Sequence, residues 1–201
     1  MGVLGGTFNP PHLGHMVCAQ EAHAQLDLDR VLLVPVAVPP HKELREEPGA
    51  QRRLALCRAA VEGDERFAVS GIDVDRGGPS YTVDTLTALH AQHPESDLTF
   101  IAGGDMARSL STWHQPERVL ALAAFAVAER ESVGRADILD ALSDVRGADR
   151  LRFFDMPRID VSSSMIRRRV AEGRPVRYLV PDAVADAIEE QGLYRSPVEA
   201  A

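Results

Sequence analysis

The stretch Val3-Leu-Gly-Gly-Thr-Phe-Asn-Pro-Pro-His-Leu-Gly-His15 is the one around which the rest of the chain is organised. Its apolar start predicts a buried strand, and we expect Gly5 and Gly6 to form a turn where the backbone comes close to a ligand. The two prolines end regular structure before a helix begins near Leu13. A ligand here would meet a helix N-terminus, where free N–H groups and the helix dipole favour an anion. The stretch therefore indicates a site for a nucleotide phosphate.

His12 and His15 are three residues apart, so on a helix they can share one face and point at the same ligand. Two histidines at this spacing are more often surface residues or metal ligands than catalytic groups. Zinc requires three or four ligands at suitable spacing, and neither Cys18 nor Cys57 completes such a pattern. We therefore predict no protein-held metal, and we expect both cysteines to be packing residues in a reducing compartment.

The composition is that of an ordinary globular protein, with 201 residues of which 45% are hydrophobic and 26% charged. This length predicts one domain over residues 1–195, followed by a loose tail at 196–201. No apolar run approaches the ~20 residues that span a bilayer, and no basic region followed by a long apolar segment opens the chain. We expect a cytoplasmic protein without membrane contact.

Acidic residues outnumber basic ones by 30 to 22, which gives a formal net charge of −8. A broad basic surface for nucleic acid is therefore not expected, and any polyanionic ligand must meet locally clustered bases. We predict that the protein has no nucleic-acid partner.

Short apolar runs alternate with helical patterns along the chain. Such alternation predicts an α/β fold: a Rossmann-like, doubly wound parallel sheet in a single domain with a C-terminal helical portion. After the strand that begins at Val3, strands are expected at Arg30–Pro35, Phe67–Ser70, Leu98–Ala102, Phe125–Ala128 and Leu151–Phe154, and helices at Met16–Leu26, Gln51–Val61, Thr82–Leu89, Ala136–Leu142, Ser164–Ala171 and Pro181–Gln191. Ligands of such sheets bind beyond the carboxyl ends of the strands, so each loop after a strand is a candidate site.

The loop after the second strand contains Pro39 and Pro40, which stiffen it and present Lys42 at the expected ligand edge. A solvated surface lysine is the simpler interpretation of Lys42 alone. A stiff loop at the carboxyl end of a strand is nevertheless suited to aim a cation at phosphate. Arg52 and Arg53 open the next helix and are expected on the surface, although either could reach the same site.

Three further segments fit a nucleotide site. Ser80 or Thr82 is expected to cap a helix after a Gly-Pro turn. A buried strand then runs into Gly103-Gly-Asp105, where the carboxylate either binds ribose hydroxyls or caps a helix. Trp113 is the only tryptophan, and it either packs in the core or stacks on a ligand ring.

The last motif, Asp160-Val-Ser-Ser-Ser-Met-Ile-Arg-Arg-Arg169, places three hydroxyls at a helix start and three arginines one turn later. The serines and the helix N-terminus can cradle a phosphate while Arg167 forms a forked contact with it. The alternative is a helix cap with solvated arginines, and this alternative is preferred for Arg168 and Arg169.

Together these motifs resemble those of the HxGH nucleotidyltransferase superfamily and, within it, of the bacterial nicotinate-nucleotide adenylyltransferases. The resemblance covers nearly the whole chain and rests on Gly5–His15, Pro39–Lys42, Ser80–Leu86, Gly104–Asp105, Thr112–Trp113, Val161–Arg167, Tyr178–Pro181 and Gly192–Arg195. It implies an enzyme of NAD biosynthesis that joins nicotinate mononucleotide to the AMP of ATP, giving nicotinate adenine dinucleotide and pyrophosphate.

The resemblance also implies roles for single residues. The implied catalytic residues are His12, His15, Lys42 and Arg167. The implied contacts with ATP are made by Gly5, Gly6, Thr7, Phe8, His12, His15, Gly103, Asp105, Ser162, Ser163 and Arg167. Those with the nicotinate nucleotide are made by Thr7, Asn9, Lys42, Thr82, Val83, Asp84, Thr85 and Trp113. Mg²⁺ is expected only as the counter-ion of ATP, and a homo-oligomer is left open.

The sequence departs from the family pattern at two positions. His114 stands where tyrosine is common, which puts one nicotinate contact in question, and Ser164 stands where threonine is common. Two other functions stay open: another adenylyltransferase of the superfamily, acting on pantetheine phosphate or nicotinamide nucleotide, and a nucleotide-binding sensor without turnover. The Ser80 and Trp113 segments argue against the first, and the intact histidines argue against the second.

A preference for the nicotinate over the nicotinamide nucleotide is expected from one helix start. The helix entered through Ser80–Thr85 would offer the amides of Val83 and Asp84, and the positive end of its dipole, to a carboxylate. A carboxamide would instead bring N–H donors towards these donors.

Overall fold

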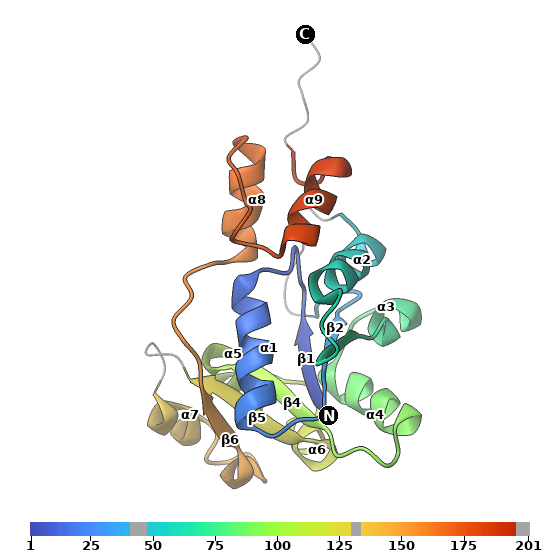
Figure 1. The fold of residues 1–201 in the computed structure, drawn as a ribbon. Helices are drawn as coiled ribbons and strands as arrows, with labels where there is room; N and C mark the ends of the chain where they lie inside the picture. Colours follow the sequence, from blue (N-terminus) through green and yellow to red (C-terminus); the bar gives the residue numbers. More distant parts are fainter. Residues whose placement is uncertain (41–47, 130–133, 196–201) are drawn as a thin grey trace.

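The computed structural model describes residues 1–40, 48–129 and 134–195. Parallel strands there form one six-stranded sheet in the order β3-β2-β1-β4-β5-β6 (Figure 1). The strands are β1 (Gly2–Gly6), β2 (Val31–Pro35), β3 (Phe67–Val69), β4 (Thr99–Gly103), β5 (Ala124–Glu129) and β6 (Arg152–Asp155). This is the order of doubly wound dinucleotide-binding sheets, with the reversal between β1 and β4. The Rossmann-like fold expected from the alternating pattern is confirmed.

Each helix expected from the sequence is present, with ends that differ by a few residues. The helices are α1 (Leu13–Gln25), α2 (Ala50–Val61), α3 (Ile72–Arg76), α4 (Thr82–Gln92), α5 (Gly104–Arg108), α6 (Pro116–Leu122), α7 (Arg135–Ala141), α8 (Ser163–Ala171) and α9 (Asp182–Glu190), with 3-10 turns η1 (Leu110–Thr112) and η2 (Ala148–Arg150). The sequence analysis expected Pro181 in the first turn of α9. In the structure Pro181 is instead the N-cap of that helix. The sequence analysis missed α3, α5 and α6, which are too short to show a helical period.

The central strands are apolar on both sides because helices cover both faces of the sheet. Successive strand residues point to opposite faces, so Val3 joins the apolar cluster under α4 and α6, whereas Leu4 joins the cluster under α1. A third cluster joins α2 to α8 and α9 around Leu56 and Ile166. In Figure 1 these last helices lie beyond the end of β1 that leads into α1.

Arg53 on α2 is wholly buried, although the sequence suggested a surface residue. Its guanidinium donates to the backbone carbonyls of Thr7 at 2.8 Å, Val36 at 2.7 Å and Ala37 at 2.9 Å. These carbonyls belong to the segments that follow β1 and β2. One side chain therefore fixes both segments at the carboxyl edge of the sheet, while its neighbour Arg52 is exposed.

The glycine pair of the first motif lies within β1, and not in a turn as predicted from the sequence. Gly5 pairs with Val34 and Gly6 with Pro35. The left-handed backbone conformation falls on Phe8, whose φ is 49°. A Cβ atom on Gly6 would lie 3.1 Å from the Phe8 ring. A larger residue at Gly6 would therefore have to displace the Phe8 ring slightly.

Both cysteines pack in the core, as expected. Cys18 on α1 and Cys57 on α2 are both buried. Burial raises the pKa of the Cys57 thiol strongly, and the Arg53 guanidinium lowers it by less. The thiol therefore stays protonated and unreactive in the folded protein.

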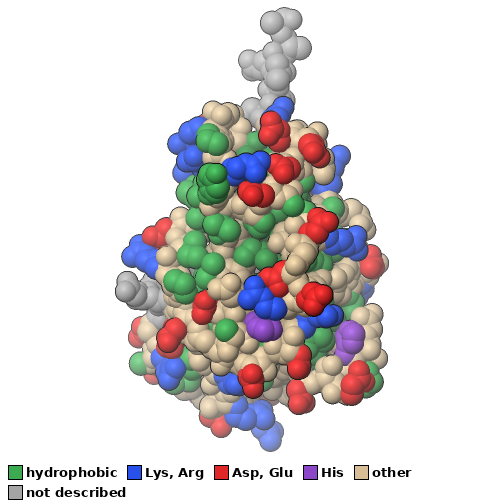
Figure 2. All heavy atoms as spheres, viewed as in Figure 1, with side chains coloured by type: hydrophobic (Ala, Val, Ile, Leu, Met, Phe, Trp, Pro, Cys, Tyr) green, Lys and Arg blue, Asp and Glu red, His purple; other side chains and the backbone are tan. Residues whose placement is uncertain are grey.

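The surface does not gather charge of one sign on the face drawn in Figure 2, where acidic and basic side chains are interspersed. None of the described helices has the length and apolar character needed to cross a membrane.

We predict that Arg53→Met destabilises the protein by about 3 to 5 kcal/mol, because three buried carbonyls lose their donor at ~1 to 3 kcal/mol each and part of this is relieved by relaxation. Urea unfolding monitored by circular dichroism measures this change. Arg52→Met is the matched control and should alter the free energy of unfolding by less than about 0.5 kcal/mol. Equal effects of the two substitutions would contradict the role given to Arg53.

Candidate functional site

A crevice opens where β1 and β4 part at their carboxyl ends. The pairing of β1 with β2 continues to Gly6 and Pro35, whereas its pairing with β4 ends at Leu4 and Ile101. The chain leaves β1 for α1 on one face and leaves β4 for α5 on the other. This is the topological switch point, at which sheets of this kind bind their ligands.

The two histidines of the first motif form a unit at the start of α1. Both histidines were expected on one helix. In the structure His15 is the third residue of α1, whereas His12 is the N-cap that precedes it. The His12 amide donates to Nδ1 of His15 at 3.2 Å, in the reciprocal arrangement of a capping box. Since Nδ1 of His15 accepts this bond, Nε2 carries the proton of the neutral ring and can donate to an anion.

Neighbouring residues fix the orientation of both imidazole rings. The ring centroids of His12 and His15 are 3.8 Å apart, and the Phe8 ring meets that of His15 edge-on at 4.9 Å. A Cβ atom on Gly14 would lie 3.1 Å from the His12 ring. The glycine between the histidines therefore lets the His12 ring lie against the start of α1.

The start of α8 contacts the same motif from the C-terminal part of the chain. Ser163 Oγ donates to the carbonyl of Pro10 at 2.8 Å, and Arg167 Nη1 donates to the carbonyl of Asn9 at 2.9 Å. Arg167 Nη2 also donates to Ser164 Oγ at 3.3 Å. The structure thus brings Arg167 to the histidine motif, and the phosphate site that the resemblance implies for both stays a prediction.

The other residues of this helix behave largely as expected. Ser162 is the N-cap and accepts a hydrogen bond from the Met165 amide at 3.2 Å. Arg168 is exposed. Arg169 departs from the expectation of a solvated side chain, because it donates to the Pro175 carbonyl through Nε at 3.0 Å and Nη2 at 2.9 Å.

Asn9 presents a buried polar atom at the centre of the motif. The residue is only 3% exposed, and its side-chain oxygen has no hydrogen-bond partner among the described residues. A buried acceptor without a donor costs ~1 to 3 kcal/mol, so this oxygen is suited to a donor supplied by a ligand.

A cavity of ≈ 370 Å³ begins at the first motif, whose Gly5, Gly6 and Thr7 form part of its wall. Its wall includes the end of β1, the segment after β2, the start of α4 and the segment after α5. Four of the residues assigned by resemblance to the nicotinate nucleotide line it, namely Thr7, Thr82, Thr85 and Trp113. The volume lies near the lower end of the ~300 to 1,000 Å³ typical of small-molecule sites, which suits a single ring.

Trp113 belongs both to the core and to the cavity wall. Its ring makes edge contacts with Phe100 at 5.8 Å and Phe125 at 5.9 Å between centroids, and Nε1 donates to Ser109 Oγ at 3.2 Å. The same residue is half-buried and lines the cavity. Core contacts hold the indole in place while part of it faces the cavity.

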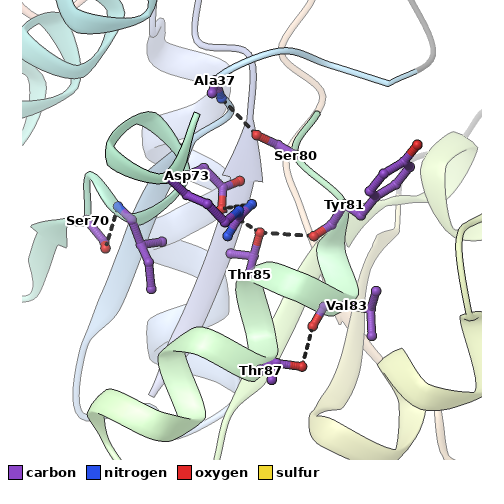
Figure 3. Close-up of polar contacts among 10 residues, drawn as sticks. Ala37, Ser70, Asp73, Ser80, Tyr81, Val83, Thr85 and Thr87 are labelled. Atoms are coloured by element: carbon purple, nitrogen blue, oxygen red, sulfur yellow. Dashed lines mark hydrogen bonds and ion pairs between the residues drawn. The ribbon is translucent and has the colours of Figure 1, made fainter. Parts of the chain in front are cut away.

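The start of α4 is built differently from the sequence prediction. Its N-cap is Tyr81, and neither Ser80 nor Thr82 caps it. Ser80 Oγ instead accepts from the Ala37 amide at 2.8 Å, which ties the segment after β2 to the entry of α4 (Figure 3). The hydroxyl was misassigned because short-range patterns favour local capping over a contact between distant segments.

The backbone amides at the start of α4 also have hydrogen-bond partners that differ from the prediction. The sequence analysis predicted that the Asp84 amide is available to a ligand. In the structure it donates to the Tyr81 carbonyl at 3.0 Å and is therefore not available. The amides of Thr82 and Val83, the first two residues of α4, have no acceptor within the helix. The Asp84 side chain is exposed, and the Val83 side chain is buried in the core.

Gly103 and Asp105 do not line the cavity. Gly103 ends β4 and is the N-cap of α5, so Asp105 does not cap that helix. Asp105 is exposed in the first turn of α5, at the carboxyl edge of the sheet. Lys42 lies outside the described residues. Within those residues, no group of three or more His, Cys, Asp or Glu side chains is placed to hold a metal ion.

The cavity-lining residues that the sequence analysis did not identify include Asp73, Met106 and Tyr81. The Tyr81 ring lies 4.7 Å from that of His114, which also lines the cavity. Tyr81 could have been found because it stands inside a quoted motif. Asp73 lies on a five-residue helix that shows no pattern in the sequence.

The chain matches the family described as cytidylyltransferase-like over residues 3–169. Among curated relatives, a probable nicotinate-nucleotide adenylyltransferase of Halalkalibacterium halodurans is 43% identical over 98% of this chain and 91% of its own length. Another of the same description, from a Roseiflexus species, is 44% identical over 97% of this chain and 98% of its own.

Solved structures confirm the fold. The nicotinic acid mononucleotide adenylyltransferase of Plasmodium falciparum, complexed with NaAD, superposes with a TM-score of 0.74 at 18% identity and covers 96% of each chain. The same enzyme complexed with APC also gives a TM-score of 0.74, at 16% identity.

Proposed function

Because the chain belongs to the cytidylyltransferase-like family, we propose that it transfers the adenylyl group of ATP to nicotinate mononucleotide. The products are nicotinate adenine dinucleotide and pyrophosphate, in NAD biosynthesis. The observation that carries this proposal is the junction of two sites at one crevice: the His12–His15–Arg167 group, suited to phosphate, and the ring-sized cavity lined by Trp113. Relatives above 40% identity that are named for this activity support it.

The reaction asks little covalent chemistry of the protein. The 5′-phosphate of the mononucleotide has a second pKa near ~6, so it arrives ionised and attacks the α-phosphorus of ATP without a general base. Catalysis then depends on aligning the two substrates and on offsetting the charge that develops on the departing pyrophosphate. Both tasks require donors and cations in fixed positions.

The first site supplies such groups. Nε2 of His15 can donate to a phosphate oxygen because Nδ1 is engaged with the His12 amide. Arg167 offers a forked cation that is already oriented by the Asn9 carbonyl. The start of α8 adds a helix N-terminus beside it. Asn9, with its buried oxygen, is assigned to a donor of the bound nucleotide, such as a ribose hydroxyl.

The cavity determines which mononucleotide accepts the adenylyl group. Trp113 offers part of its indole to the pyridine ring. The amides of Thr82 and Val83, at the positive end of the α4 dipole, are the groups that we assign to the nicotinate carboxylate. Asp84 does not oppose this assignment, because its side chain is exposed and is not part of the cavity wall.

Magnesium is proposed to enter with ATP. As the counter-ion of ATP, the ion would be held mainly by the phosphates of the nucleotide. When bound, it offsets negative charge on those phosphates. The roles of Lys42 and Asp105, a cytoplasmic location and a homo-oligomeric state stay predictions.

Pyrophosphate release from ATP tests the proposed function. The assay is run with nicotinate mononucleotide, nicotinamide mononucleotide and pantetheine phosphate as acceptors. Release with nicotinate mononucleotide as the best acceptor supports the proposal. Release with another acceptor alone assigns the chain to a different adenylyltransferase, and no release with any acceptor favours a nucleotide-binding sensor.

We predict that His12→Ala and His15→Ala each lower kcat by about 10² or more and change the KM for ATP much less, because the imidazoles stabilise charge that appears in the transition state. Steady-state kinetics with varied ATP measures both constants. His23→Ala, on the last turn of the same helix, is the matched control and should leave both unchanged. An unchanged kcat in both motif variants would refute the assignment.

We predict that the unmodified enzyme prefers nicotinate to nicotinamide mononucleotide by roughly ten-fold to several thousand-fold in kcat/KM, since the amide would leave two groups unpaired at ~1 to 3 kcal/mol each. Trp113→Ala should weaken both substrates and keep their ratio, because both rings offer the same face for stacking. The comparison needs both acceptors at saturating ATP. Equal kcat/KM values in the unmodified enzyme would move the chain to the nicotinamide or dual-specificity class.

A further inference from the structure

A buried carboxylate forms part of the cavity wall. Asp73 on α3 is 2% exposed, and it lines the cavity next to Thr85 and Tyr81 (Figure 3). Among the described residues of that wall, Asp73 and His114 are the ones that can carry a charge. The cavity therefore contains a negative group of the protein itself, close to where the ligand ring would lie.

Two donors from different elements hold this carboxylate. Thr85 Oγ1 on α4 donates to Asp73 Oδ1 at 2.7 Å, and Arg76 Nη2, one turn further along α3, donates to the same oxygen at 2.8 Å. The Arg76 side chain is 32% exposed, so it reaches Asp73 from the solvent side and is not itself part of the described cavity wall. The negative charge of Asp73 is therefore paired by a guanidinium that lies outside the cavity wall.

This charge matters because the proposed substrate brings a second carboxylate into the same cavity. Two like unit charges held roughly 7 Å apart, at an effective dielectric constant between about 20 and 40, weaken binding by a factor of about five to fifty. A carboxamide carries no net charge and escapes this repulsion. An unpaired Asp73 would thus favour the wrong nucleotide.

We propose that Arg76 is a specificity-determining residue that acts through Asp73: by pairing the buried carboxylate, it makes the cavity accept an anionic ring substituent. The inference rests on the proposed function, which supplies the acidic substrate. Thr85 contributes the second hydrogen bond and links the pair to the first turn of α4, whose leading amides we assign to the substrate carboxylate. Charge pairing and helix position are therefore set by one cluster.

The experiment measures equilibrium binding of nicotinate mononucleotide and of nicotinamide mononucleotide by calorimetry. ATP is omitted, so the result does not depend on turnover. Both ligands share the ribose and the phosphate, so the ratio of their dissociation constants isolates the effect of the ring substituent. A loss of folding alone would weaken both ligands equally and leave the ratio unchanged.

Arg76→Met keeps the side-chain stem and removes the charge. We expect it to weaken the acid by about five-fold or more and the amide by less than about two-fold. Arg76→Lys retains the charge and should keep most of the preference. The double variant Arg76→Met with Asp73→Asn removes both charges and should restore the acid-to-amide ratio to within about two-fold of the unmodified protein.

Arg66→Met is the matched control, because Arg66 forms a comparable ion pair with Asp64 on the surface before β3. It should leave the ratio unchanged. The inference is overturned if Arg76→Met keeps the ratio of the unmodified protein, if the double variant stays as defective as Arg76→Met, or if the unmodified protein binds neither nucleotide. Failure of the proposed function is distinguishable from these outcomes, since it appears as absent pyrophosphate release while the binding ratio is still measured.

Discussion

The buried guanidinium of Arg53 is the interaction on which the site depends. The carbonyls that it binds follow β1 and β2 at the carboxyl edge of the sheet. Thr7, one of its partners, belongs both to the histidine motif and to the cavity wall. The relative position of the phosphate site and the cavity is thereby fixed by one side chain, which a reaction governed by alignment requires.

The charged and polar groups of the site are also held in place by hydrogen bonds from neighbouring residues. Groups assigned to the substrates are each oriented by backbone or by a neighbouring side chain: His15 by the His12 amide, and Arg167 by the Asn9 carbonyl. The acidic wall residue is paired from outside the cavity by Arg76. A chain with a net charge of −8 can therefore bind two polyanions, because the charge that matters is local and held in place.

The fold was predictable from the sequence because short apolar runs, which form the buried strands, alternate with segments long enough to show a helical pattern. The motifs also indicated that Arg167 and the histidine motif share one site, and the structure places Arg167 against Asn9 of that motif. Contacts between distant segments were not predictable: Ser80 looked like a local cap and bonds Ala37 instead, and Arg53 looked like its exposed neighbour. Asp73 was missed because α3 is too short to show any pattern.

The most direct test of the central claim follows the phosphorus atoms of ATP. ATP labelled at the α-phosphorus is incubated with the protein, Mg²⁺ and nicotinate mononucleotide, and the products are separated by chromatography. The account predicts that the label appears in nicotinate adenine dinucleotide while unlabelled pyrophosphate is released in equal amount. Label recovered as free AMP or ADP, without any dinucleotide, would contradict it.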